Sequence, residues 1–219
     1  MKRVLPILLA ILLLAALAAC AGSTTTGDPT ENSAADTTKE RLATATSADT
    51  TAAPAQEPSA ETGKTLVVVF SATGTTKGVA EKIAAIENAD LYEIKAAQDY
   101  TAADLNWNDS GSRTTLEQND KSARPEIGSA PLTLDGYTKI YIGYPIWWGE
   151  EPRIMDTFVE TYAFDGITMI PFCTSGGSGI GRSGQNLAEN AGSGNWLEGQ
   201  RFSGSVSEAD LQAWIDGLH

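Results

Sequence analysis

Hydroxyl-bearing side chains are concentrated in one six-residue segment that directly follows an apolar run. Residues 71–76 read Ser-Ala-Thr-Gly-Thr-Thr, and four of the six side chains carry a hydroxyl group. At a helix N-terminus, backbone N–H groups and the helix dipole attract an anion, and hydroxyls can donate around it. An ordinary helix cap, the structural alternative, needs one such residue and leaves three unexplained. The sequence therefore predicts a phosphate-binding loop made of Ser71, Thr73, Gly74, Thr75 and Thr76.

A second segment combines two adjacent tryptophans with a glycine. Residues 144–151 read Tyr-Pro-Ile-Trp-Trp-Gly-Glu-Glu and lie between an apolar run and a predicted helix. From one short turn, at most one of the two tryptophans can face the core. We therefore expect the other to be an exposed platform on which a flat aromatic ring stacks. The pattern leaves open which one stacks, and core packing is an equal alternative for the other. The candidate cofactor-binding residues here are Pro145, Ile146, Trp147, Trp148 and Gly149.

A third segment is rich in glycine. Residues 174–181 read Thr-Ser-Gly-Gly-Ser-Gly-Ile-Gly, and glycines let a backbone approach a planar ligand closely. The spacing of Gly179, Gly181 and Gly184 fits G-x-G-x-x-G, but a dinucleotide fingerprint would begin at the strand end, and this one starts several residues later. Cys173, just before the segment, is expected to be a buried small hydrophobe. The candidate binding residues are Thr174, Ser175, Gly176, Gly177, Ser178 and Gly179.

Each of the three segments follows a predicted β-strand. Apolar runs predict strands at 64–70, 91–94, 139–143, 167–173 and, weakly, 201–203. Helical spacing predicts helices at 75–86, from Pro152 to Tyr162, and after a Ser207 cap. This alternation predicts an α/β domain with a three-layer, doubly wound, five-stranded parallel sheet. Ligands of such sheets bind outside the carboxyl ends of the strands, where the three segments lie.

The N-terminus is typical of an exported protein. Residues 1–19 begin with Lys2 and Arg3 and continue with an apolar run over 4–14, which is too short to be a permanent membrane span. The segment Leu17-Ala18-Ala19-Cys20 resembles the lipobox of bacterial lipoproteins; the alternative is a signal peptide with a cysteine at its cleavage site by chance. The resemblance implies removal of 1–19, lipidation of Cys20 and an extracytoplasmic, cell-membrane location.

Residues 20–63 are predicted to be a disordered, lipid-anchored linker. They are rich in Thr, Ser, Ala and Pro, and Leu42 is their only large apolar residue. Such a stretch cannot bury enough surface to offset its ordering entropy. As a flexible coil it would hold a domain roughly 35 Å from the membrane. The remaining residues, 64–219, suit a single domain.

Charge and histidine content exclude several classes of function. The chain has 15 Lys and Arg against 28 Asp and Glu, a net charge of −13, and no basic tract, so nucleic-acid binding is disfavoured. Its single histidine is the last residue, which leaves no internal imidazole for a catalytic couple or a zinc site. Residues 64–219 carry 11 basic and 21 acidic side chains. An anionic lipid surface would repel that domain, so membrane contact is expected only through the lipid anchor.

Together the three segments resemble those of the flavodoxins, over residues 64–219. Ser71-x-Thr73-Gly74-x-Thr76 matches the FMN-phosphate signature of that family, and Trp148-Gly149-Glu150 resembles the loop whose aromatic ring stacks on the isoalloxazine and whose glycine peptide faces flavin N5. Thr174-Ser175-Gly176-Gly177 is similar to the third flavin loop. The resemblance implies FMN as cofactor, sheet order 2-1-3-4-5, and a long insertion, including Asn106–Asp109 and Ser122–Glu126, that closes over the flavin.

The resemblance implies an FMN-binding electron-transfer protein that is tethered to the membrane by its lipid. An acidic surround disfavours the anionic reduced flavin, which is typical of a low-potential one-electron carrier, and it attracts redox partners with a basic surface. The third loop lacks the tyrosine of electron-carrier flavodoxins, so an FMN-dependent NAD(P)H or quinone oxidoreductase is an alternative. Arg124, Arg153 and Arg182 are candidates for a nicotinamide phosphate only because they lie near predicted loops. A non-redox lipoprotein interaction module is the second alternative.

Overall fold

The computed structural model describes residues 63–218, which alternate strands and helices. The elements are β1 (Lys64–Phe70), α1 (Thr75–Glu87), β2 (Asp90–Ile94), α2 (Arg113–Asn119), β3 (Tyr137–Pro145), α3 (Arg153–Thr161), β4 (Thr168–Thr174), α4 (Ser183–Ala191), β5 (Asn195–Trp196), β6 (Gln200–Phe202) and α5 (Glu208–Asp216). The predicted signal peptide, the lipidated Cys20 and the linker lie outside the described residues. Within residues 63–218, no helix is long and apolar enough to cross a membrane.

The strands form one parallel sheet in the order β2-β1-β3-β4-β5, which confirms the predicted order. The fifth position of the sheet is built from two short strands, where the sequence predicted one. β5 pairs with the start of β4 and β6 pairs with its end. Pro171 lies in the gap between these two pairings. Proline has no N–H to donate to a ladder, which accounts for the interruption.

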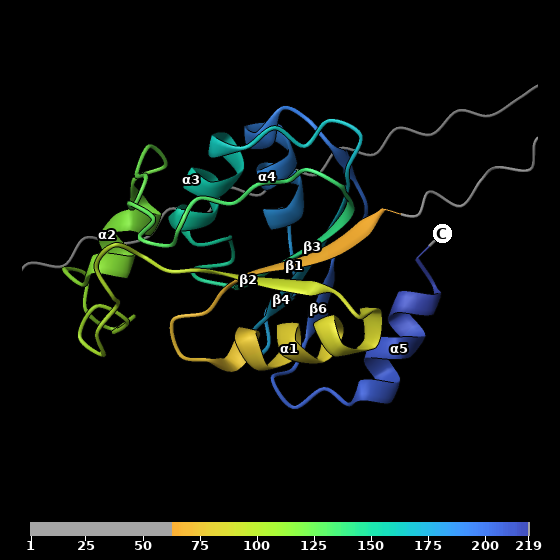
Figure 1. Ribbon diagram of the computed structural model, residues 1–219. Coiled ribbons are helices and arrows are strands. Elements are labelled where there is room, and N and C mark those ends of the chain that lie inside the picture. The colour runs from red at the N-terminus through yellow and green to blue at the C-terminus, as the bar shows by residue number, and fades with distance from the viewer. Residues whose placement is uncertain (1–62, 219) are drawn as a thin grey trace, which may run out of the picture. The chain divides into compact units, whose positions relative to one another are not determined.

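Helices cover both faces of the sheet (Figure 1), so the central strands are buried on both sides. On one face, Val67 and Val69 belong to the cluster that packs against α1 and α5. Leu66 and Val68 belong to the opposite cluster, which includes residues of α3 and α4. Successive side chains of a strand point to opposite faces. The near-continuous apolar run of β1 is therefore what this three-layer arrangement requires.

The 95–136 segment between β2 and β3 contains one short helix, α2, and otherwise irregular backbone. Figure 1 shows α2 beyond the edge of the sheet from which the β1–α1 loop emerges. The base of the segment is tied down by an antiparallel bridge, in which Ala97 N donates to Glu126 O at 2.8 Å and Gly128 N donates to Lys95 O at 2.7 Å. This bridge fixes the insertion at the carboxyl edge of the sheet. The sequence did not predict α2 or α4, because both are short and largely polar.

Candidate functional site

A pocket of about 750 Å³ opens at the carboxyl edge of the sheet. Its size is within the range of small-molecule sites. Five separate segments line it: Thr73 and Thr75; Leu105, Trp107 and Thr114; Pro145, Ile146, Trp147 and Trp148; Thr174, Ser175 and Gly176; Arg201, Ser203 and Gly204. The three segments singled out from the sequence therefore meet at one pocket, together with the insertion and the end of β6.

The β1–α1 loop presents the first turn of α1 to this pocket. Gly74 is the N-cap with φ +84°, a left-handed conformation that favours glycine. No side chain of the described residues caps this helix end, so its first N–H groups are left for a ligand. The hydroxyl oxygens of Thr73 and Thr75 lie 3.3 Å apart at the pocket wall. This helix end has the donors that an anion needs.

The other two hydroxyl residues of the loop do not line the pocket. Thr76 is buried, and its Oγ1 lies 2.8 Å from Oγ1 of Thr174, so this hydroxyl links the loop to the end of β4. Ser71 is half-buried and lines a smaller neighbouring pocket beside Tyr100. The structure thus places Thr73 and Thr75 at the pocket, and Thr76 in a supporting position behind it.

The paired tryptophans belong to a tight turn. Trp147 and Glu150 exchange two backbone hydrogen bonds of 3.0 Å, and the central residues, Trp148 and Gly149, have φ +51° and +84°. Two positive φ values define a type I′ turn, in which the first central position favours asparagine or glycine. A bulky residue in this conformation costs about 1–3 kcal/mol, and such strain is often stored at functional sites.

This turn gives the two indole rings different surroundings. Trp148 is 45% exposed at the tip of the turn and lines the pocket. Trp147 packs edge-on against Phe70 and Tyr100, with ring centroids 5.6 and 5.3 Å apart. The structure therefore offers Trp148 as the exposed platform, and it holds Trp147 in the packing beneath.

The glycine-rich loop after β4 meets the pocket only at its beginning. Ser175 and Gly176 line the pocket, whereas Gly177, Ser178 and Gly179 are exposed and do not. Gly149 does not line the pocket either; its carbonyl oxygen lies 3.4 Å from the place where a Cβ of Gly181 would be. The turn and the glycine loop therefore approach each other at residues that do not line the pocket.

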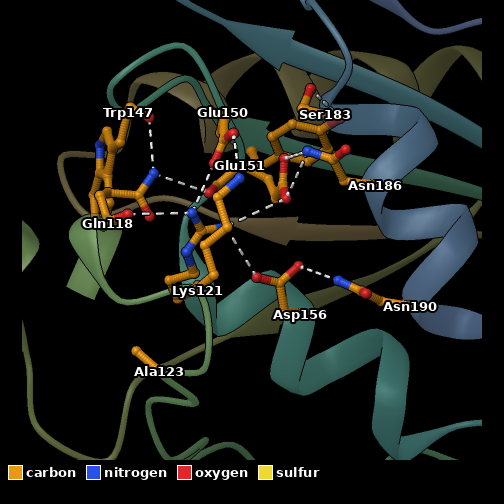
Figure 2. A network of polar contacts seen from close by, with 12 residues as sticks. Gln118, Lys121, Ala123, Trp147, Glu150, Glu151, Asp156, Ser183, Asn186 and Asn190 are labelled. Atoms are coloured by element: carbon orange, nitrogen blue, oxygen red, sulfur yellow. Dashed lines mark hydrogen bonds and ion pairs between the residues drawn. The ribbon is translucent and has the colours of Figure 1, made fainter.

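A buried polar network lies behind the tryptophan turn, and Figure 2 shows it at close range. Arg153 is 4% exposed, and its Nη2 donates to Glu150 Oε2 at 2.7 Å. Its Nη1 lies 3.4 Å from Asp156 Oδ2 and 3.6 Å from Glu151 Oε1. Gln118 of α2 donates through Nε2 to the carbonyl oxygens of Trp147 (2.8 Å) and Glu151 (3.1 Å). The network thus joins the insertion to the turn.

The carboxyl groups of this network titrate differently. Glu151 is 1% exposed, and burial raises its pKa to about 7, with the nearby Asp156 charge acting in the same direction. Burial also raises the pKa of Asp156, against a hydrogen bond from Asn190. The hydrogen bond from Arg153 lowers the pKa of Glu150. The network therefore holds a carboxyl group that changes charge near neutral pH.

Cys173 is fully buried, as expected from its surroundings in the sequence. Burial raises the pKa of its thiol to about 12. The reactive form of cysteine is the thiolate, so this side chain is inert at neutral pH. Among the described residues, no group of His, Cys, Asp and Glu side chains is arranged to hold a metal ion.

A family model described as flavodoxin matches residues 64–218. The chain belongs to the flavodoxin family. Its fold and the position of its pocket are those expected of a flavodoxin, with ligand-binding loops at the carboxyl ends of parallel strands. A search of curated proteins gave no match.

Solved structures similar to this flavodoxin chain include two from Bacteroides. A putative flavoprotein from Bacteroides uniformis is 44% identical with a TM-score of 0.67, covering 70% of this chain and 98% of that one. A putative flavoprotein from Bacteroides eggerthii is 46% identical with a TM-score of 0.67, covering 71% and 98%. A flavoprotein in complex with FMN from Lactobacillus acidophilus is 25% identical with a TM-score of 0.53, covering 70% and 99%.

The sequence did not assign several residues of the flavodoxin pocket. Trp107, in the insertion, is 76% exposed and lines the same pocket. Arg201 lines it from the end of β6, whereas Arg124, Arg153 and Arg182 do not line it and each pair with a carboxylate. The usable signal for Arg201 was its place in the fifth predicted strand, because strand ends line the ligand edge of such a sheet.

Proposed function

We propose that this flavodoxin-family domain binds FMN in the 750 Å³ pocket and works as an electron-transfer protein. The observation that carries the proposal is the meeting, at one pocket, of an uncapped helix end with an exposed tryptophan on a strained turn. The flavoprotein from Lactobacillus acidophilus, in complex with FMN, supports the choice of cofactor.

The residues at the pocket fit the chemical parts of FMN. The uncapped N–H groups of α1 and the hydroxyls of Thr73 and Thr75 suit a phosphate group. The exposed ring of Trp148 suits a flat aromatic system. A Cβ at Gly176 would have no neighbour within 4 Å, so the backbone there is open to close approach by a planar ligand.

Bound FMN supplies one-electron and two-electron redox chemistry. The protein's part is to bind, orient and tune. Thr73 and Thr75 would donate to the phosphate, and the dipole of α1 would add attraction for its charge. Trp148 would stack on the ring, and the Gln118–Arg153 network holds the turn that carries Trp148. With 11 basic against 21 acidic side chains, the domain makes additional negative charge in the pocket unfavourable.

Cofactor binding is tested by adding FMN to the purified apoprotein and following quenching of flavin fluorescence. We expect saturable, one-to-one binding that is weakened at least about tenfold in Thr73→Ala/Thr75→Ala, because charge-assisted hydrogen bonds are removed. Thr133→Ala, at an exposed threonine away from the pocket, is the matched control. Absence of FMN binding by the wild-type chain would contradict the proposal and favour a non-redox interaction module.

Electron transfer is tested by stepwise anaerobic reduction of the FMN-loaded protein, followed by visible absorption. A one-electron carrier gives, after one electron per FMN has been added, an absorption spectrum that differs from those of the oxidised and the fully reduced protein. Direct conversion from the oxidised to the fully reduced spectrum would contradict the carrier function.

We also propose that the domain is lipid-tethered. The support is the sequence of residues 1–20, in which a short apolar run is followed by Leu17-Ala18-Ala19-Cys20. Radiolabelled palmitate should label the wild-type protein in a bacterial host and should not label Cys20→Ser. Equal labelling of both proteins would contradict lipidation at this cysteine.

A second candidate function is that of an FMN-dependent NAD(P)H or quinone oxidoreductase. It is favoured by the loop at 174–181, which carries no aromatic side chain to cover the pocket. An open pocket would admit a second substrate beside the flavin. Two results together would favour this function over the carrier. NAD(P)H oxidation should depend on both FMN and an added quinone, and stepwise reduction should show only the oxidised and the fully reduced spectra.

A further inference from the structure

Arg201 is a cation at the pocket without a carboxylate partner among residues 63–218. The other arginines in that range each have a carboxylate oxygen within 4.0 Å: Arg113, Arg124, Arg153 and Arg182. Acidic side chains outnumber basic ones almost two to one in this domain, 21 against 11. Although acidic side chains are abundant, none of those in the described range pairs with Arg201. Its guanidinium, at the wall of the pocket, is therefore available to pair with an anionic ligand.

The fold holds the Arg201 guanidinium in a defined place. Arg201 is paired with Cys173 in the β4–β6 register and is half-buried. Its Nη2 donates to the backbone oxygen of Ser175 at 2.6 Å, and its Nε donates to Ser175 Oγ at 3.2 Å. A guanidinium has five N–H donors. These bonds use two of them, so the remaining donors are available to a ligand in the pocket.

The segment that carries Arg201 reaches the helix end that we assign to the phosphate. Ser203 and Gly204 follow it and line the same pocket. A Cβ on Gly204 would lie 2.5 Å from Cγ2 of Thr75, so the backbone of Gly204 packs directly against the Thr75 side chain. Thr174, next to Ser175, is linked to Thr76 of α1 by the 2.8 Å contact of their hydroxyls. The cation and the first turn of α1 therefore belong to one end of the pocket.

We propose that Arg201 binds the phosphate group of FMN together with the first turn of α1, and thereby makes the pocket selective for a phosphate monoester over uncharged riboflavin. This inference rests on the proposed function. A helix end and neutral hydroxyls supply partial charges, whereas a guanidinium adds a full positive charge and a planar set of donors that matches phosphate oxygens.

A purely structural role for Arg201 makes a different prediction. If the side chain only holds Ser175 in place, its removal disturbs the wall of the pocket and weakens FMN and riboflavin alike. If it binds the phosphate, its removal weakens FMN alone. The ratio of the two dissociation constants separates the two roles.

The experiment measures dissociation constants of FMN and riboflavin for the full-length apoprotein by fluorescence quenching. Arg201→Gln should weaken FMN about 10- to 100-fold, the usual range for a lost charge-assisted hydrogen bond, and should change riboflavin less than about twofold. Arg201→Lys keeps the charge and should retain most of the preference for FMN. Arg182→Gln is the matched control, because Arg182 is 71% exposed and lies outside the pocket lining.

Two results would overturn the inference while leaving the proposed function intact: equal weakening of FMN and riboflavin by Arg201→Gln, or unchanged FMN affinity in that variant. If Arg201→Gln does not fold, Arg201→Lys still provides the test. It should bind FMN somewhat more weakly than the wild type, because the planar set of donors is lost, with riboflavin affinity unchanged; equal weakening of both flavins would contradict binding of the phosphate. Wild-type protein that binds neither flavin would instead overturn the proposed function.

Discussion

At the scale of single residues, the tryptophan pair illustrates how neighbours in sequence acquire different tasks. The type I′ turn rotates Trp148 outward at φ +51°, while Trp147 stays packed on Phe70 and Tyr100. Strain in the turn destabilises the folded state, and burial of Trp147 stabilises it. The exposed ring is therefore maintained by the surrounding packing, and it is available for stacking.

Replacement of each tryptophan should separate ligand binding from stability. Trp148→Ala should weaken FMN about tenfold, from lost stacking and contact area, with unfolding free energy little changed, because the ring is 45% exposed and alanine keeps the Cβ that strains this position. Trp147→Ala should lower the unfolding free energy by about 2 kcal/mol or more through lost packing. Fluorescence titration and urea denaturation measure the two effects, and equal effects of both substitutions on FMN affinity would contradict a single platform.

Glu151 should make the stability of the domain depend on pH. Its pKa is raised in the folded protein from 4.5 to about 7, so the folded state binds a proton more tightly than the unfolded state. The stability contribution is therefore fully present below pH 4.5 and is lost as the pH rises to 7. Its size is of the order of 3 kcal/mol from the shift.

The matched variant for this effect is Glu151→Gln, which keeps the shape of the side chain and removes its titration. Urea denaturation between about pH 5 and pH 8 should show the wild-type protein losing stability relative to the variant as the pH rises. A constant difference between the two proteins over this range would contradict the assignment.

At the scale of elements, the hydrogen bonds between α2 and the tryptophan turn hold the insertion beside the pocket. Gln118 supplies the connection through its two bonds to the carbonyls of Trp147 and Glu151. The guanidinium of Arg153 adds a contact of 3.3 Å to the Gln118 carbonyl. Because α2 has only seven residues, it depends on these contacts more than on its own hydrogen bonds.

Gln118→Ala should loosen α2 with little effect on the sheet. Two carbonyl groups lose a buried partner, which should lower the unfolding free energy by about 1–3 kcal/mol. Hydrogen exchange should speed up in residues 113–119 and in the 147–151 turn, while β1 stays protected. Leu116→Ala is the control on the same helix, since Leu116 is 57% exposed. Equally faster exchange in β1 would mean that the hydrogen bonds of Gln118 stabilise the whole domain and not only α2 and the turn.

At the scale of the whole molecule, the net charge of the domain bears on which partners it would attract. We propose that the 21 acidic and 11 basic side chains of residues 64–219 favour a redox partner with a basic surface, because such a charge balance would attract it and would repel an anionic lipid surface.

Electron transfer from the reduced protein to a basic haem protein should therefore slow down with salt. Raising the ionic strength from about 10 mM to about 200 mM should lower the second-order rate constant about tenfold or more, because screening removes the steering field. Stopped-flow absorption measures the rate, and an acidic haem protein as acceptor is the control. A rate that is independent of salt would contradict electrostatic recognition of the partner.

The amino-acid sequence by itself determined the fold class and the loops of the site. Strands, helices and caps are local, so apolar periodicity located β1 and α1, and Ser207 was identified as a cap that indeed accepts from Asp210 N at 3.1 Å. The sheet order followed from the resemblance to flavodoxins, which the topology confirmed. Short polar helices such as α2 lack that periodicity and were not predicted.

Tertiary structure alone decided which side chains share the pocket. Whether Trp147 or Trp148 is exposed depends on the backbone conformation of the turn, and whether Thr76 is free depends on Thr174, which lies 98 residues away in sequence. Arg201 is significant because of its surroundings: it lines the pocket, it donates to Ser175, and it has no carboxylate partner among the described residues. Such properties are sums over long-range neighbours, and spacing along the chain does not contain them.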